Sequence, residues 1–221
     1  MCGKFTQVEW WTDIEGFSQP LDEISDEAPV SFVTPMRLAK VVRIGEDGGR
    51  ELVPMRWGFS KPDNPSFKPD HMHARAETID MRRTFSEAFE ERRGIVLAET
   101  FNEGEQLPSG KTKQWVIRPK DRKPIAIAVI WEEWSGDAGS EPTFVMVTVP
   151  PNDLIGRITD RMPAILRRED WPVWLGETDA PLAEAKALLK TFDDGGAWEM
   201  SEQAAAKSSK QAKPKSQFDL F

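Results

Sequence analysis

Short runs of β-branched and other apolar residues, each bounded by glycine, proline or charged residues, constrain the fold of this chain more than any other feature. Runs of this kind are typical of β-strands. They follow one another with few helical segments between them, which favours an α+β fold with a largely antiparallel, barrel-like sheet. The expected strands are residues 39–47, 51–57, 94–100, 114–119, 124–131 and 143–149.

Two segments have the residue spacing of helices that would flank such a sheet. In residues 84–93, Thr84 is followed three positions later by Glu87, which is the pattern of a capping box at a helix N-terminus. In residues 180–192, apolar residues recur on one face of a helix. We therefore expect a few helices packed against the sheet.

The distribution of residue types divides the chain into one domain and a tail. Nine Trp and twelve Phe in 221 residues supply enough aromatic bulk for a core, and we assign residues 1–200 to a single domain. Residues 201–216 are rich in Ser, Ala, Lys and Gln and hold no large apolar side chain, so we expect a flexible, disordered linker. Apolar residues return only in the last segment, residues 217–221.

Composition also excludes several classes of protein. No apolar run approaches the roughly 18 residues of a membrane-spanning helix, so we expect no membrane partner. A single cysteine cannot form an internal disulfide, which favours a reducing, cytoplasmic location. The net charge of −8 argues against a basic surface that coats DNA in bulk.

That single cysteine, Cys2, directly follows the initiator methionine. Removal of Met1 would leave Cys2 with an α-amine of pKa about 8 beside a thiol of pKa about 8.5. An amine attacks an aldehyde to give a Schiff base, and a thiol on the adjacent carbon can close a thiazolidine ring on the same aldehyde carbon. An N-terminal Cys2 is therefore a trap for aldehydes. The alternative is a small, buried apolar residue near a chain end.

An ordered set of motifs spans most of residues 1–175. Its members are MCGKF (1–5), PMRWGF (54–59), HARAET (73–78), RRGIVLAETFNEGE (92–105) and TDRMPAIL (159–166). The set resembles the SOS-response-associated peptidase (SRAP) family, which includes the abasic-site shielding proteins. The order of the motifs and the last of them are the most specific parts of this resemblance.

The resemblance implies a function in the DNA damage response. SRAP proteins bind single-stranded DNA at abasic sites, where the ring-opened sugar is an aldehyde that the residue matching Cys2 captures as a thiazolidine crosslink. The crosslink shields the strand during replication and can reverse, and the family also removes its own Met1, which implies peptidase and lyase activity. We expect a nucleoid-associated monomer that needs no cofactor or metal.

The resemblance also assigns site residues, with Cys2 as the nucleophile. Glu103 would assist proton transfers, provided that burial raises the pKa of its carboxyl group towards neutrality. Arg75 and Arg161 are candidates for phosphate contacts, as is Lys4, which stands where the family has arginine; a structural ion pair is the alternative for the two arginines. Trp57 is a candidate for stacking on a base, and a core tryptophan is the alternative.

Some positions depart from the family pattern. His73 stands where the family has asparagine, and Thr159 stands where it has a catalytic histidine. A threonine hydroxyl cannot act as an acid or a base near pH 7. Around Glu103, two aromatic residues of the family are replaced by Asn102 and Gly104. We hypothesise that His73 takes over proton transfer to or from the sugar oxygen. The alternative is that it only donates the hydrogen bond of the family asparagine.

The sequence leaves other functions open as alternatives. His71 and His73 with Cys2 could supply three metal ligands, but the chain holds no further His or Cys to support a metal site. A Cys/His protease that cleaves other proteins is a second alternative. The main competing class is a binding module that has an SRAP-like domain without efficient covalent chemistry. The departures at Thr159 and in FNEGE, residues 101–105, favour that module, whereas the retained Cys2 and Glu103 oppose it.

The C-terminal segment QFDLF, residues 217–221, resembles the peptide by which bacterial replication proteins bind the sliding clamp. In such a peptide Gln217 would make hydrogen bonds, and Leu220 and Phe221 would fill an apolar pocket. A linker before the motif would let it dock while the domain samples nearby DNA. The alternative is a disordered end with no partner.

Overall fold

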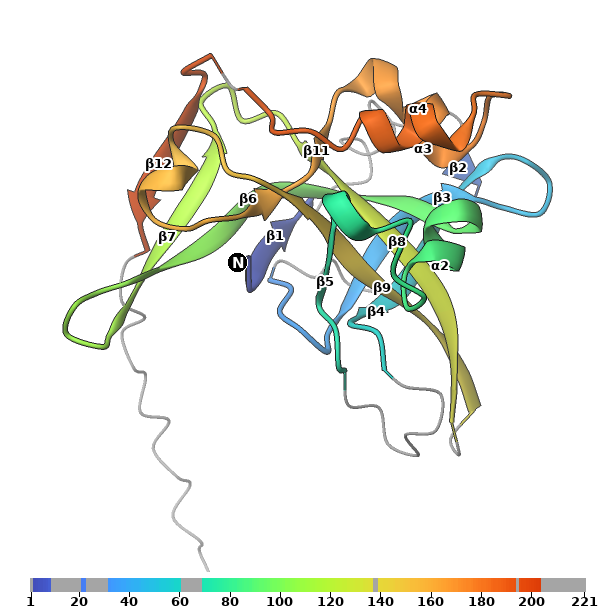
Figure 1. Cartoon of the computed structure of the whole chain (residues 1–221), viewed down its shortest axis with the longest axis horizontal. Helices are drawn as coiled ribbons and strands as arrows, with labels where there is room; N and C mark the ends of the chain where they lie inside the picture. The colour runs from blue at the N-terminus through green and yellow to red at the C-terminus, as the bar shows by residue number, and fades with distance from the viewer. Residues whose placement is uncertain are drawn as a thin grey trace, which may run out of the picture.

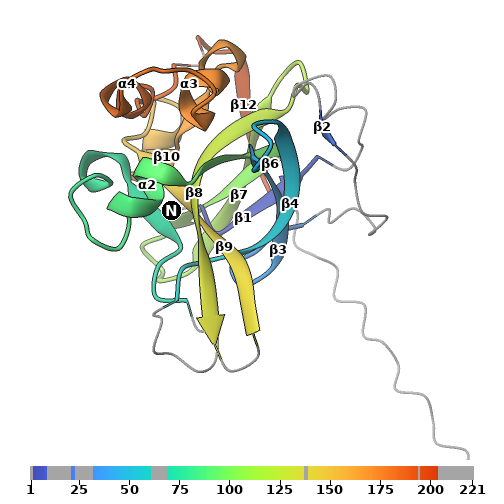
Figure 2. The same cartoon turned by 90° about the vertical axis from the view of Figure 1, so that its right-hand side faces the viewer.

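The structure is a computed structural model that describes residues 2–8, 21–22, 32–60, 69–136, 139–193 and 195–203. In this part of the chain the strands form one sheet, and the α-helices gather at one flank of it (Figures 1 and 2). The expected α+β class is therefore confirmed, with the sheet as the dominant element.

Among the described residues, the six longest strands coincide with the apolar runs of the sequence, although their ends differ by several residues. β6 extends well past the expected 94–100, and it carries Glu103 within the strand. The shorter strands β1, β2, β5, β10, β11 and β12 lie outside those runs. The strands are β1 (Lys4–Gln7), β2 (Leu21–Asp22), β3 (Leu38–Ile44), β4 (Arg50–Trp57), β5 (His73–Arg75), β6 (Arg93–Gln106), β7 (Thr112–Pro119), β8 (Ile125–Gly136), β9 (Gly139–Val149), β10 (Met162–Pro163), β11 (Ile165–Leu166) and β12 (Trp198–Glu202).

The sheet has the strand order β11-β8-β9-β4-β3-β6-β7-β12, and β8 also pairs with β6. The pairings from β8 through β9, β4, β3 and β6 back to β8 form a closed path, but only one residue pair, Val42 with Ile95, joins β3 to β6. The sheet is therefore mostly antiparallel, as expected, without forming a clear barrel. The β8–β9 hairpin is buried along most of its length, which explains its nearly continuous apolar sequence.

The helices are short and depend on packing against the sheet. Phe89 of α2 contacts Trp174 of α3 with ring centroids 6.1 Å apart, and the Trp174 indole N–H donates a hydrogen bond to Gly94 O at 2.8 Å. Helices of five or six residues are not stable alone, so these contacts supply their stability. The helices are η1 (Ala76–Thr78), α2 (Ser86–Glu91), η2 (Ile155–Arg157), η3 (Arg168–Asp170), α3 (Trp171–Leu175) and α4 (Leu182–Ala187), where η denotes a 3₁₀ helix.

The predicted capping box at Thr84 is wrong. Phe85 occupies the N-cap position of α2, and no side chain caps this helix. The turn before the helix explains the difference, because the Phe85 and Ser86 amides both donate to Arg82 O. Thr84 is left exposed in this turn, while the buried Phe85 ring sets the start of α2.

The C-terminal edge of the sheet extends beyond the expected domain boundary. β12 pairs with β7 as far as Glu202, opposite Trp115, and the Gln203 amide donates to Gln114 O. Residues 201–203, assigned from sequence to the linker, therefore belong to the folded unit. The rest of the linker and the QFDLF motif lie outside the described residues. Within the described residues, no helix is long and apolar enough to cross a membrane.

Candidate functional site

Pairing between β1 and β6 brings the N-terminus to the middle of the sheet (Figure 1). Lys4 lies opposite Asn102 and Phe5 opposite Phe101, with both phenylalanine side chains fully buried. The buried Phe5 anchors β1, and the residues just before Lys4 consequently lie against the β6 segment that contains Glu103. The structure thus brings Cys2 and Glu103 together, as the resemblance implied.

Cys2 is buried, with 1% of its surface exposed. Its thiol donates a hydrogen bond to Lys4 O, with an Sγ–O distance of 3.3 Å. Burial raises the pKa of the thiol to about 12, and the negative charge of Glu103 acts in the same direction. The thiol is therefore protonated at neutral pH, and a neighbouring base must remove its proton before the sulfur can attack.

Glu103 is the charged residue best suited to be that base. It is fully buried within β6, and burial raises the pKa of its carboxyl group to about 7. The positive charge of the N-terminal amine lowers this pKa in part, and the negative charge of the exposed Asp160 raises it. A group with a pKa near 7 is present in both protonation states at neutral pH, so it can donate a proton in one step and accept one in the next.

His73, the first residue of β5, holds the backbone of Cys2. Its Nε2 atom lies 2.7 Å from Cys2 O. Burial lowers the pKa of the imidazole to about 4, so the ring is neutral at pH 7 and Nε2–H donates this hydrogen bond. This geometry favours the alternative in which His73 replaces the hydrogen bond of the family asparagine. It does not favour His73 as the proton-transfer group.

Trp57, the last residue of β4, is a core residue in this structure. None of its surface is exposed, and its ring stacks on Phe144 with a centroid distance of 6.2 Å. Its indole N–H donates to Met72 O at 3.0 Å. The Trp57 and His73 rings form a T-shaped contact with their centroids 5.9 Å apart, so Trp57 packs against a residue of the site. It has no exposed face on which a base could stack, which corrects the sequence-based assignment.

The two arginines of the motifs have different environments. Arg161 is buried and holds Glu77 through two hydrogen bonds of 2.5 and 2.9 Å, and it also donates to Thr148 O at 2.6 Å. These contacts match the structural ion pair rather than a free phosphate-binding group. Arg75 is exposed at the end of β5 and is therefore accessible to a phosphate. Lys4 is half-buried, with its ammonium group 4.4 Å from the centre of the Phe32 ring.

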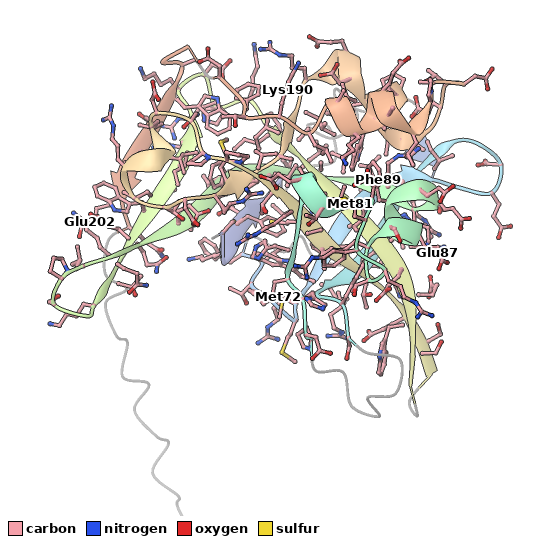
Figure 3. The ribbon with its side chains drawn as sticks, in the orientation of Figure 1. Met72, Met81, Glu87, Phe89, Lys190 and Glu202 are labelled. Carbon is pink, nitrogen blue, oxygen red and sulfur yellow. The ribbon has the colours of Figure 1, made fainter. Side chains whose placement is uncertain are left out.

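An open pocket of about 470 Å³ gives access to the site. The segment that precedes and forms β5 contributes most of its wall, and Figure 3 shows Met72 just before this strand. Sequence reasoning missed Asp70 and Met72 and considered His71 only as a metal ligand. The spacing of His71 and His73 was the available signal. The lining residues are Cys2, Gly3, Asp70, His71, Met72, His73 and Arg75.

Thr159 lies between η2 and β10 and is half-buried. Its amide donates to Ile155 O at 3.1 Å, and the neighbouring Asp160 carboxylate acts on the pKa of Glu103. The loop is thus close enough to influence the site, but at residue 159 it presents a hydroxyl instead of an imidazole. Among the described residues, no cluster of three or more His, Cys, Asp or Glu side chains is arranged to hold a metal ion.

Comparison with known proteins identifies the family of this chain. The family model described as SOS response associated peptidase (SRAP) matches residues 1–206. The abasic site processing protein YoqW of Bacillus subtilis is 30% identical over 201 residues, covering 87% of this chain and 88% of the relative. The abasic site processing protein HMCES of Gallus gallus is 28% identical over 221 residues, covering 87% of this chain and 64% of the relative.

A solved structure supports the fold independently of these sequence matches. A protein from Bordetella bronchiseptica superposes with a TM-score of 0.76 at 21% identity, covering 92% of this chain and 100% of that one. At this level of identity the likeness concerns the fold alone. The family model and the relatives place the sequence motifs, from the N-terminal MCGKF to TDRMPAIL, in one family: the chain belongs to the SOS response associated peptidases, the SRAP family.

Proposed function

We propose that this protein captures abasic sites in single-stranded DNA through a covalent thiazolidine at Cys2, after removal of Met1. The observation that carries the proposal is the burial of Cys2 beside Glu103, a carboxyl group whose pKa is raised to about 7. Relatives named abasic site processing proteins supply the substrate class. The exposed Arg75 and the nearby Lys4 are the candidates for phosphate contacts.

The chemistry proceeds in two condensation steps. The Cys2 amine adds to the sugar aldehyde, and the resulting carbinolamine loses water to form a protonated Schiff base, with neutral Glu103 protonating the departing hydroxyl. The Glu103 carboxylate then accepts the thiol proton as the sulfur attacks the same carbon, and the π electrons of the C=N bond move to the nitrogen as the ring closes. One water molecule is released overall. Reversal follows the same path in the opposite direction.

A denaturing gel tests the proposed function directly. The protein is incubated with single-stranded DNA that contains one abasic site, and the same oligonucleotide with an intact base serves as the control. A slower-migrating species that forms only with abasic DNA supports covalent capture. Its absence, together with retained binding in a native gel, would instead favour the binding-module alternative suggested by Thr159.

The role of His73 as a hydrogen-bond donor leads to a prediction about two variants. His73→Asn is expected to crosslink within about threefold of the wild-type rate, because an asparagine amide can still donate to Cys2 O. His73→Ala leaves that carbonyl without this donor, and the loss of about 1 kcal/mol corresponds to a rate reduction of roughly fivefold to tenfold. The initial rate of crosslinking is the measurement. Equal impairment of both variants would instead assign proton transfer to His73.

We further propose that the QFDLF motif binds the sliding clamp of the replication machinery. Glu202, at the end of β12, pairs with Trp115 of β7, and Trp115 also pairs with Glu103 of β6. Only β7 therefore separates the end of β12 from Glu103. The tail therefore leaves the domain close to the site, and a docked tail would hold the site near replicating DNA.

Deletion of residues 217–221 is expected to abolish capture of the clamp in a pull-down with the purified proteins, because the two apolar anchors are lost. Crosslinking to naked abasic DNA should not change, because the deleted residues include neither Cys2 nor any other residue assigned to the site. The matched control replaces Lys210 in the linker with alanine and should still capture the clamp. Equal capture with and without the motif would exclude this partner.

A further inference from the structure

His71 is a second imidazole in the Cys2 pocket. It lines this pocket together with Cys2, His73 and Arg75. Its backbone is fixed by hydrogen bonds with Phe59, from Phe59 N to His71 O at 2.8 Å and from His71 N to Phe59 O at 3.2 Å. The imidazole and the buried Phe85 ring form a T-shaped contact with their centroids 5.3 Å apart. The ring is thus held at the wall of the pocket that Cys2 also lines.

The two histidines of the pocket differ in the freedom of their ring nitrogens. Nε2 of His73 is engaged with Cys2 O, whereas no hydrogen bond joins a ring nitrogen of His71 to any other residue in the described part of the chain. His71 is half-buried, so its ring remains accessible from the pocket. Imidazole is the side chain best suited to take up or release a proton near neutral pH. Of the two, His71 is therefore the one available for proton transfer.

The chemistry of an abasic sugar requires two proton-transfer groups. The sugar is mainly a cyclic hemiacetal, and the reactive aldehyde appears only when the bond from C1′ to O4′ breaks. One group must remove the proton from the hydroxyl on C1′, and another must deliver a proton to O4′. Glu103 can supply one of these functions. Thr159, at the position where the resemblance places a catalytic histidine, cannot supply the other.

We propose that His71 is the second proton-transfer group and opens the sugar ring. This inference rests on the proposed function. The His71 imidazole takes the proton from the C1′ hydroxyl, the C1′–O4′ bond breaks as the carbonyl forms, and the Glu103 carboxyl delivers a proton to O4′. Exchange with water then restores both groups, so the step is a net isomerisation of the sugar.

The other residues of the pocket fit this role less well. The Arg75 guanidinium stays protonated and cannot act as a base. Met72 carries no exchangeable proton on its side chain, and the pKa of His73 is lowered by burial. Asp70 is exposed at the pocket and is the remaining charged group that faces His71 there, so the test includes it.

Two DNA substrates separate ring opening from the later steps. The first carries a natural abasic site, which must open. The second carries an acyclic aldehyde, made by periodate cleavage of a vicinal diol side chain, which has no hydroxyl group placed to close a ring. Crosslinking rates are measured for the wild type and for His71→Gln, with Met72→Leu as the pocket control and Asp70→Asn as the alternative base.

His71→Gln is expected to slow crosslinking of the natural site by about tenfold to 100-fold and to leave the acyclic substrate at the wild-type rate. Normal reaction with the acyclic aldehyde also shows that the variant is folded. Wild-type rates on both substrates, an equal loss on both, or a selective loss in Asp70→Asn instead would overturn the inference. Failure of the wild type on both substrates would reject the proposed function itself.

Discussion

Cys2→Ser is expected to form no stable crosslink with abasic single-stranded DNA. Serine keeps the α-amine, so a Schiff base still forms, but a hydroxyl does not close a ring of thiazolidine stability. Because the thiol is buried and Ser differs from Cys by one atom, the fold should be retained. The measurement is the fraction of slow-migrating species on a denaturing gel after one hour.

Borohydride supplies the control for this prediction. It reduces a Schiff base to a permanent secondary amine, so it should restore a band with Cys2→Ser at close to the wild-type intensity. That result would show that the amine reaches the aldehyde and that only ring closure is lost. A stable crosslink with Cys2→Ser in the absence of borohydride would contradict the role of the thiol.

Glu103→Gln is expected to reduce the crosslinking rate by at least about 100-fold, because a glutamine amide cannot exchange protons with the carbinolamine or the thiol. The pKa of Cys2 is raised to about 12, so loss of the nearby base is felt most at the thiol step. The wild-type rate should show an inflection near pH 7, the pKa of Glu103, and the variant should lack it. Retention of that inflection in Glu103→Gln would assign it to another group.

The same substitution has an opposite effect on stability. Burial raises the pKa of Glu103 to about 7 in the folded state, whereas the unfolded pKa is 4.5. The neutral carboxyl group therefore contributes fully to the free energy of unfolding below pH 4.5, and this contribution is lost as the pH rises through 7. The free energy of unfolding falls by an amount on the order of 3 kcal/mol over this range. Glu103→Gln should therefore unfold at a higher temperature than the wild type at pH 8, with a smaller difference at pH 4. Thermal unfolding followed by circular dichroism measures this.

The sheet could be predicted because its central strands are buried on both faces and have nearly continuous apolar sequences. The short strands could not. β5 covers only His73–Arg75, and its place beside β9 depends on long-range contacts that no local pattern encodes. The failure at Thr84 has a similar origin, since burial of Phe85 outweighs the preference of threonine for the N-cap position.

The arrangement of the site also depends on long-range contacts that local sequence patterns do not encode. The proximity of Cys2 and Glu103 follows from the β1–β6 register, which the sequence did not predict. The resemblance alone placed the two residues in one site. Whether Trp57 and Arg161 face solvent or the core could not be predicted, because aromatic and arginine side chains occur in both places. The pocket residue His71 was visible in the sequence, but its position opposite Phe85 was not.

Mass spectrometry of the gel-purified crosslink tests the central claim most directly. After nuclease and trypsin digestion, we predict that the sugar remnant is carried by the N-terminal peptide of residues 2–4, with Met1 absent and with the mass of a thiazolidine that needs no borohydride to survive. Met1 still attached in the crosslinked protein, or the remnant on a lysine elsewhere in the chain, would contradict capture by the amine and thiol of Cys2.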